Sequence, residues 1–577
     1  MGNEFDKEKL LVVGVKKRSW FSRRLLFWFV LFLVFFVVSF YFCFVPSRLV
    51  ILPETTLVTE CLTPEGLPDY LAAYLAMNNA QLKKPEDNGY RLVLEAFGPY
   101  AFVRRDTKKT IEWEELPTHS TYGEWYKDMW IPLCEAMAID PTKKPKKCEP
   151  IVEFYYVVDG DSEQDKQAKG KKIKKLEELK SKPWRTEDNP EFAELLDKSA
   201  EVLDLFSFAV KKPVWDYYRS HEYTLKVNLK YGINPMIVFN EDSTMLYVMC
   251  DDFAIRVSKR LGENDVAGAL DDALTILRIA RHYKNRHTYY EHNTAFAIES
   301  VGIKSLQMIL AYGNLNSDQI RQLIKEFDSL PKHEDSFEKL VQFEKLVYLD
   351  SILVPRKFDF LKDDMVYLNL GHLYRDDNPR YQSIYKLYIK ILLDLPVDLN
   401  YALKRGLARW RSLESAAKER DIQKRWKLVQ KHYDEAKAIY DQIYDLQVVS
   451  LTPLIRIRSQ VFADIVFNKL GCSTVFAVHV KQEKKVLTIH NLFYVSSALE
   501  LYQHDNGNYP DSLDAITPKY LEKIPIDPLS TDNKFTYKKT DTGYILYSFG
   551  PDEKDDGGDE KSEYRGIKGD IVVERKR

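Results

Sequence analysis

Residues 246–283 read LYVMCDDFAIRVSKRLGENDVAGALDDALTILRIARHY, and this stretch decides the fold. Apolar residues recur with helical spacing over 246–261 and again over 266–283. Only the turn Gly262-Glu263-Asn264-Asp265 separates the two patterns. Because so short a turn places two amphipathic helices side by side and antiparallel, we expect a helical hairpin at the centre of the chain.

The same arrangement extends in both directions along the chain. We expect further helices over 289–312, 317–328 and 334–352, one that begins at Asn189-Pro190, and a long one over about 408–447 that ends before Pro453. Glycine is scarce, at 23 of 577 residues, so there are few helix breakers. Leu261-Gly262 followed by Ala267, Ala269 and Ala273 is similar to a tetratricopeptide repeat, but no fixed period recurs. The sequence therefore predicts a mainly α protein with an irregular antiparallel helical array over 186–452.

Charge is balanced over the whole chain, with 84 Lys and Arg against 86 Asp and Glu and a net charge of −2. Such a chain has no overall field that would hold it on nucleic acid. Residues 160–183 are rich in lysine, but no aromatic residue for base stacking occurs there before Trp184. We interpret this stretch as a solvated helix or a linker, and we expect no nucleic-acid partner.

The N-terminal region contains Leu25–Val45, a run of 21 residues without a charged side chain. At about 1.5 Å per residue a helix of this length spans roughly 31 Å, the thickness of one hydrocarbon core. Bulky residues at Phe40–Val45 do not suit signal cleavage. The basic residues lie mostly before the run: Lys16, Lys17, Arg18, Arg23 and Arg24. The sequence therefore predicts a single-pass signal anchor over 20–45 in the inner (cytoplasmic) membrane, with 1–19 cytoplasmic and the bulk extracytoplasmic, in the periplasm.

Five of the six cysteines lie after this segment, and an odd number in an oxidising compartment leaves at least one thiol free. Cys134 and Cys148 form the one close pair, and the sequence leaves open whether they form a disulfide or remain thiols. No C-x-x-C pattern supports a redox or cysteine–zinc site.

Sequence motifs for the common enzyme classes are absent, including H-E-x-x-H, G-x-S-x-G, the Walker loop and G-x-G-x-x-G. His282, His287 and His292 follow at five-residue steps, which rotate each by about 140° on a helix and separate them as metal ligands. The adjacent carboxylates are interpreted as helix-surface charge: Asp251 and Asp252, Asp271 and Asp272, Asp363 and Asp364. An enzyme with a site assembled from scattered residues such as Asp251, His292 and Glu299 stays open as an alternative.

The last hundred residues change character. A helix that ends near Tyr502 runs into HDNGNYP at 504–510, and a P-I-D-P turn follows at 525–528. Alternating runs at 534–539 and 544–549, joined by TDTG, predict a β-hairpin. GPDEKDDGGD at 550–559 and a closing strand at 570–573 complete a small α+β unit.

This order of motifs, over about 486–575, resembles the globular domain of the type II secretion major pseudopilin (G-type). The resemblance implies a calcium ion in the acidic loop, with Asp552 and Asp570 matching by position and Asp555, Asp556 and Asp559 in the intervening loop. Ca²⁺ prefers six to eight oxygen ligands, which a glycine-containing acidic loop supplies. The chain departs from the family in lacking the prepilin leader and in having Leu529 where tryptophan is usual after Asp-Pro.

The whole chain is also similar to large membrane-anchored bacterial proteins of undefined activity that have a helical middle and this tail. The expected organisation is therefore a membrane-proximal mixed region with a Lys-rich linker over 46–185, the helical array, a long helix over 453–504 that leads into the tail, and a pseudopilin-like α+β domain over 505–577. We expect a membrane-anchored scaffold that binds other envelope proteins and is linked to type II secretion or pilus-like assembly.

Overall fold

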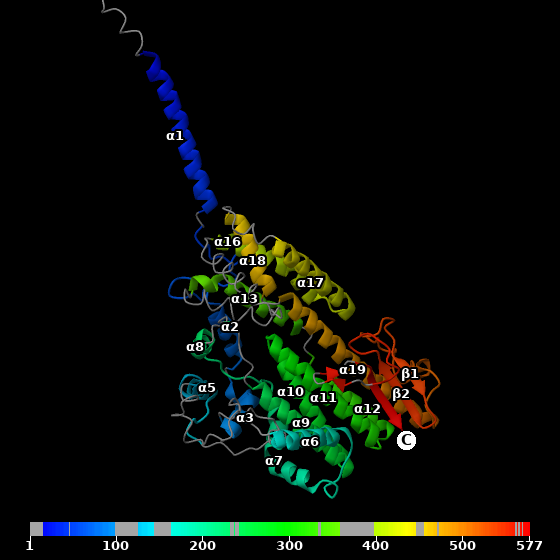
Figure 1. The fold of residues 1–577 in the computed structure, drawn as a ribbon. Helices are drawn as coiled ribbons and strands as arrows, with labels where there is room; N and C mark the ends of the chain where they lie inside the picture. The colour runs from blue at the N-terminus through cyan, green and yellow to red at the C-terminus, as the bar shows by residue number, and fades with distance from the viewer. Residues whose placement is uncertain are drawn as a thin grey trace, which may run out of the picture.

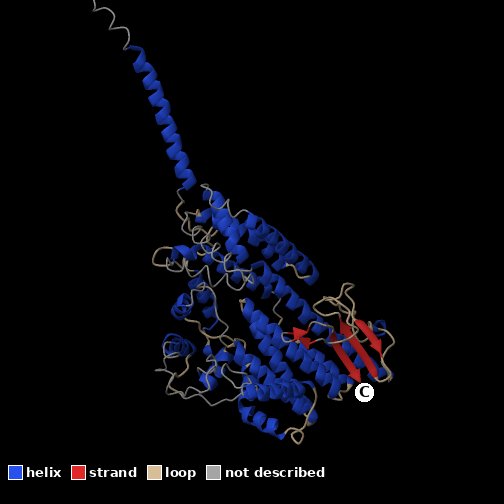
Figure 2. Ribbon diagram, viewed as in Figure 1, coloured by secondary structure: helices blue, strands red, loops and turns tan. Residues whose placement is uncertain are grey.

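A computed structural model describes residues 16–44, 47–82, 84–98, 125–143, 163–230, 236, 242–332, 336–357, 397–445, 455–469, 472–559, 562–563, 566–567 and 569–576. Helices make up most of this part of the chain, and the strands gather near the C-terminus (Figure 2). The prediction of a mainly α fold with a small α+β C-terminal region is confirmed.

The N-terminal helix α1 (Lys16–Phe44) projects away from the rest of the molecule (Figure 1). Its 29 residues give a length of about 43 Å. Every side chain from Leu25 to Val38 is exposed, with fractions between 46% and 68%. Among the described residues, Tyr289–Tyr312 is the helix long and apolar enough to cross a membrane, but 67% of its apolar window is buried inside the protein, and Leu25–Val38 of α1 is a shorter apolar stretch. The helix Tyr289–Tyr312 belongs to the core, and the apolar surface of α1 is left without protein contacts that would bury it.

The predicted central hairpin is present as α9 (Ser243–Gly262) and α10 (Val266–Lys284), with α11 (Tyr289–Tyr312) packed against both. Asp265 caps α10 by accepting the Gly268 N–H at 2.9 Å. Thr288 and Glu291 form a reciprocal capping box that begins α11. These local signals explain why the turns predicted from the sequence are confirmed.

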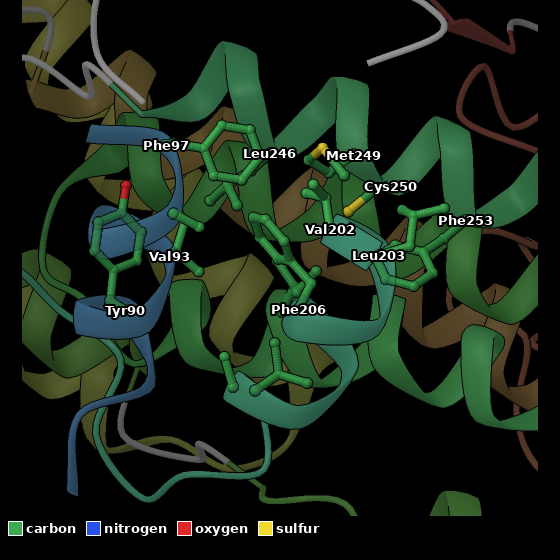
Figure 3. Packing of buried hydrophobic residues seen from close by; sticks show 14 of the residues in the cluster. Tyr90, Val93, Phe97, Val202, Leu203, Phe206, Leu246, Met249, Cys250 and Phe253 are labelled. Carbon is green, nitrogen blue, oxygen red and sulfur yellow. The ribbon is translucent and has the colours of Figure 1, made fainter. Parts of the chain in front are cut away.

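A first hydrophobic core joins the N-terminal helices to α9 (Figure 3). In it α3 (Gly89–Phe97) packs on α7 (Pro190–Ala209), and α7 packs on α9. Tyr90, Val93 and Phe97 come from α3, whereas Leu203 and Phe206 come from α7. Helix α5 (Ile131–Met137), preceded by a π-helical turn at Tyr126–Trp130, belongs to this core, whereas α2 (Tyr70–Asn79) belongs to a second hydrophobic core and packs on α8 (His221–Lys230) and on the helix Ser336–Lys357.

The Lys-rich stretch forms helix α6 (Glu163–Ser181), as one of the two interpretations predicted. Leu176 and Leu179 are buried in the first core, where α6 packs on α9. After α6 the backbone at Trp184 passes close to Gly262. A Cβ at that glycine would lie only 2.1 Å from the carbonyl oxygen of Trp184. This segment is therefore a docked helix and not a free linker.

A second layer contains α13 (Ser336–Lys357), α16 (Leu399–Lys418), α17 (Ile422–Asp445) and α18 (Ile455–Lys469). The single helix predicted over about 408–447 is wrong, since α16 and α17 are separate and pack on each other. Glu419 is extended between them, and the Asp421 carboxylate accepts the N–H groups of Gln423 and Lys424, both at 2.9 Å. Asp421 therefore caps the start of α17, after the extended Glu419 has ended α16.

Helix α19 (Cys472–Asn506) connects the two layers to the C-terminal sheet. The predicted helix over 453–504 consists of α18 and α19, and α19 packs on α11, α17 and α12 (Ser317–Asp328). Its end covers an antiparallel sheet of order β1-β2-β5, formed by Thr536–Lys539, Gly543–Ser548 and Ile571–Lys576. Short strands β3 (Ser562–Glu563) and β4 (Gly566–Ile567) pair separately. The predicted hairpin is confirmed, and its sheet shares one hydrophobic core with α10, α11, α12 and α19.

Candidate functional site

The acidic loop lies beside the end of β2 and the start of β5. Asp570 is fully buried, and its two carboxylate oxygens accept the N–H groups of Asp556 at 3.2 Å and Gly558 at 2.6 Å. Asp555 accepts the Tyr547 hydroxyl at 3.1 Å and the Gly557 N–H at 2.8 Å. These two carboxylates hold the loop in its turns.

Of the three remaining acidic residues of the predicted site, Asp556 donates its backbone N–H to Asp570, and Asp552 and Asp559 sit at the ends of the loop. The Asp552 carboxylate accepts the Lys554 N–H at 3.2 Å, and the Asp559 carbonyl accepts the Asp570 N–H at 3.2 Å. Among the described residues, no three His, Cys, Asp or Glu side chains come close enough together to form a metal site. Calcium at this loop stays a prediction, and backbone carbonyls would have to supply much of its coordination.

The three residues named for an alternative enzyme site have separate partners. Asp251 pairs with Lys180 of α6 at 2.9 Å. His292 is fully buried, and its Nδ1 lies 3.0 Å from Nε2 of His479. Burial lowers the pKa of His292 to about 4, so the ring is neutral at pH 7. Glu299 pairs instead with Arg281 and His490, so the structure does not assemble Asp251, His292 and Glu299 into one site.

The interpretation of the adjacent carboxylates as surface charge is wrong for Asp252 and Asp272, which are both fully buried. Arg256 binds Asp272 in a bidentate pair, with distances of 2.9 Å from Nε and 2.6 Å from Nη2. Neighbours on a helix differ by about 100°, so Asp271 points outward while Asp272 faces the core. Asp363 and Asp364 lie outside the described residues.

A buried network of charges ties the segment before α8 to the start of α11. Arg219 lies 3.2 Å from Asp216 and 2.8 Å from Glu291, while Arg286 lies 3.4 Å from Asp242 and 3.5 Å from Glu291. Each of these side chains is at most 3% exposed. The partners are up to 72 residues apart, so no local pattern in the sequence reveals the network. Its complete enclosure favours a structural role.

The cysteine pair gives no site in the described part of the chain. Cys134 is a free thiol buried in α5, and burial raises its pKa to about 12. Cys148 lies outside the described residues. A thiol with so high a pKa is a poor nucleophile at neutral pH.

A pocket of about 410 Å³ opens where α10, α12, α17 and α19 meet. Glu299 is fully buried behind two of its lining side chains, 2.7 Å from Nη2 of Arg281 and 2.9 Å from Nε2 of His490. Arg281 and His490 line the pocket. The edge of the His490 ring packs on Phe327, with ring centroids 5.1 Å apart. This pocket is the candidate functional site, because it combines a concave surface with buried ionisable groups.

The protonation states in the pocket follow from burial and from the pairing. Burial lowers the pKa of His490, although Glu299 acts in the opposite direction, so the imidazole is neutral at pH 7. Burial alone would raise the pKa of Glu299, but Arg281 and His490 hold it well below its usual range. The His490 Nε2–H therefore donates to a carboxylate, which fixes the tautomer that leaves Nδ1 unprotonated. Sequence reasoning named Glu299 but missed His490, which is 191 residues away.

Comparisons with known proteins place no further constraint on the site. No family model matches the chain, and neither the curated proteins nor the solved structures contain a match. Fold and site geometry are therefore the basis for the functional conclusions.

Proposed function

We propose that this chain is a single-pass protein of the cytoplasmic membrane whose extracytoplasmic body binds other envelope proteins. The observation that carries the proposal is helix α1, because a solvent-exposed apolar surface along Leu25–Val38 is costly in water and favourable in a bilayer. The basic residues before this stretch support an N-terminus in the cytoplasm, as the positive-inside rule implies.

The chain that follows α1 is fastened to the body at once. The Ser47 hydroxyl donates to Asp398 at 3.0 Å, and Asn400 bonds to the Val50 N–H at 2.8 Å and to the Arg48 carbonyl at 2.7 Å. Asp398 is the N-cap of α16. This contact supports a body whose α16 end faces the bilayer, with the C-terminal sheet farther from it (Figure 1).

We further propose that the helical array stacks in a tetratricopeptide-like manner and that the C-terminal region is pseudopilin-like. The arrangement of a helix followed by a small antiparallel sheet supports the second part, as do the motifs at 504–510 and 525–528. On this basis the partners belong to type II secretion or pilus-like machinery. Because α19 and the sheet share one hydrophobic core, a partner bound to the C-terminal region would be held to the anchored body.

Reporter fusions test the topology directly. Alkaline phosphatase joined after residue 60 is expected to be active, whereas a cytoplasm-dependent fluorescent reporter at the same place is expected to be dark. The opposite pattern would reverse the orientation and reject the localisation.

Site-specific photo-crosslinking in intact cells tests the binding of partners. A crosslinking amino acid is placed at Ile526, an apolar side chain of the C-terminal region that is 46% exposed. The matched control is Phe208 on α7, which is 59% exposed. Crosslinks to a secretion or pilus protein from Ile526 and none from Phe208 support the proposal. The absence of any protein adduct at Ile526 counts against it.

Calcium at the acidic loop is a second part of the same proposal. Calorimetric titration of Ca²⁺ into the detergent-solubilised full chain is expected to show binding at millimolar or tighter affinity. Asp570→Asn is expected to abolish it, because this buried carboxylate organises the loop. A wild-type chain that releases no heat on Ca²⁺ addition would remove the idea.

The pair Glu299–His490 favours one alternative function, that of an envelope enzyme. A neutral imidazole oriented by a carboxylate is the arrangement of a general base that accepts a proton from water. Hydrolysis of p-nitrophenyl phosphate or p-nitrophenyl acetate by the wild type, lost in His490→Gln, would support this function. No turnover of either ester by the wild type would reject it for these substrates.

A further inference from the structure

The walls of the pocket above Glu299 carry an excess of positive charge. Five cationic side chains line it, against the carboxylates of Asp328 and Glu483, and the buried Glu299 adds one more negative charge. The five are Arg281, Lys284, Lys332, Arg420 and Arg425. With His490 neutral, the pocket therefore has two positive charges more than its carboxylates balance.

The protein itself uses some of these cations. Nη1 of Arg425 lies 2.7 Å from each oxygen of Glu483, and Arg281 is paired with Glu299. Asp328 accepts the hydroxyl of Tyr494. Both wall carboxylates are therefore hydrogen-bonded to other side chains, and in the part of the chain that the structure describes neither forms an ion pair with Lys284 or Lys332.

Lys284 and Lys332 have no carboxylate partner among the described residues. The ammonium of Lys284 lies 5.6 Å from the centroid of the Phe296 ring, a contact with an aromatic face. Lys284 also lies close enough to Glu299 and His490 to lower the pKa of both. In addition, Nε of Arg281 is buried without a hydrogen-bond partner. An anion in the pocket would meet two ammonium groups that lack a carboxylate partner among the described residues, beside the guanidinium of Arg281.

Besides His490 and Tyr494, the rest of the lining is apolar and consists of Phe327, Leu330, Ile422, Val486 and Leu487. A bare inorganic anion would leave this surface in contact with water, whereas a purely apolar molecule would leave the lysines unpaired. A ligand that satisfies both parts of the wall has a doubly charged head and an apolar body. A volume of about 410 Å³ is suitable for a molecule of metabolite size.

We propose that this pocket binds a small organic dianion, a phosphate monoester or a dicarboxylate with an apolar body, whose head group is held by Lys284, Lys332 and Arg281. The charge of the ligand matches the two unpaired lysines, and the apolar body covers the face that contains Phe327. This site is independent of the topology and of the protein contacts proposed above, so each can fail without the other.

Calorimetry on the detergent-solubilised full chain tests the proposal. The probes are phenylphosphonate and benzylmalonate, which carry a phosphate-like head and a dicarboxylate head on the same kind of ring. Inorganic phosphate and phenol each supply one half of the chemistry. Binding of either ring-bearing dianion, at least tenfold tighter than phosphate or phenol, supports the proposal, and the tighter of the two identifies the head group. Binding of neither, or equal binding of phenol, overturns it.

Matched lysine variants show whether the probe occupies this pocket. Lys284→Ala and Lys332→Ala are each expected to weaken the binding of the preferred dianion about tenfold, as loss of one nearby charge implies. Lys325→Ala removes an exposed lysine of α12 that does not line the pocket and is expected to leave the affinity unchanged. Raising the salt concentration is expected to weaken binding in the wild type. Unchanged affinity in Lys284→Ala and Lys332→Ala overturns the assignment.

Discussion

Replacing Glu299 with glutamine removes the carboxylate that pairs with Arg281 and His490 of the cationic pocket while keeping the shape of the side chain. Its Oε1 lies 2.7 Å from Arg281 and 2.9 Å from His490, and the residue is fully buried. Each hydrogen bond to a charged group contributes about 1.5–3 kcal/mol. Breaking a buried ion pair typically costs about 3–5 kcal/mol, because the remaining charge stays buried without its partner.

We therefore expect Glu299→Gln to destabilise the body by about 3 kcal/mol or more. For a folding unit of 150–250 residues each kcal/mol shifts the melting temperature by about 2–4 °C, so Tm is expected to fall by at least about 6 °C. Thermal unfolding of the detergent-solubilised chain, followed by tryptophan fluorescence, measures the shift. Glu194→Gln is the matched control, because it alters an exposed ion pair with Lys198 and is expected to leave Tm unchanged.

The effect of Glu299→Gln on stability is expected to depend on pH. The folded-state pKa of Glu299 lies well below the ordinary value of 4.5, so the stability that its charge contributes is present above about pH 4.5. This contribution is lost as the pH falls from 4.5 towards the folded-state pKa. The difference in Tm between wild type and Glu299→Gln should therefore shrink in acid. A difference in the free energy of unfolding below about 1 kcal/mol at pH 7, or a difference in Tm that is independent of pH, would refute the reasoning.

Two further predictions use neighbouring or similar residues as controls. Asp272→Asn breaks the bidentate pair with Arg256 and should lower the free energy of unfolding by about 3 kcal/mol in chemical denaturation. Asp271→Asn, one position away and 46% exposed, should change it by less than about 1 kcal/mol; equal effects would contradict the burial of Asp272. Gly262→Ala places a Cβ 2.1 Å from a backbone oxygen and should loosen α6, which faster tryptic cleavage within 163–181 would reveal. Gly170→Ala, whose Cβ would have open space, should leave the cleavage rate as in the wild type.

Much of the local structure follows from the sequence because its signals are local. The hairpin of α9 and α10 depends on a four-residue turn and on Asp265, which caps the second helix. The C-terminal hairpin depends in the same way on alternating strands and the turn at 540–543. The long helix predicted over 408–447 failed at Asp421, where a cap with no glycine or proline beside it starts a new helix.

Residues whose partners are distant in the sequence behave differently. Asp271 and Asp272 are chemically identical and adjacent, and yet one is exposed and the other is fully buried beside Arg256. The acidic loop shows the same limit, because the sequence identifies the carboxylates but not the N–H groups that Asp555 and Asp570 accept.

By itself, the sequence determined the helical nature of the body, the positions of most turns and the apolar N-terminal segment, because apolar periodicity and capping act within a few residues of each other. Tertiary structure alone decided which ionisable side chains meet. Glu299 and His490 are 191 residues apart, and they become partners only because α11 and α19 pack against each other. The cationic pocket exists for the same reason, since its walls come from four helices that no local pattern brings together.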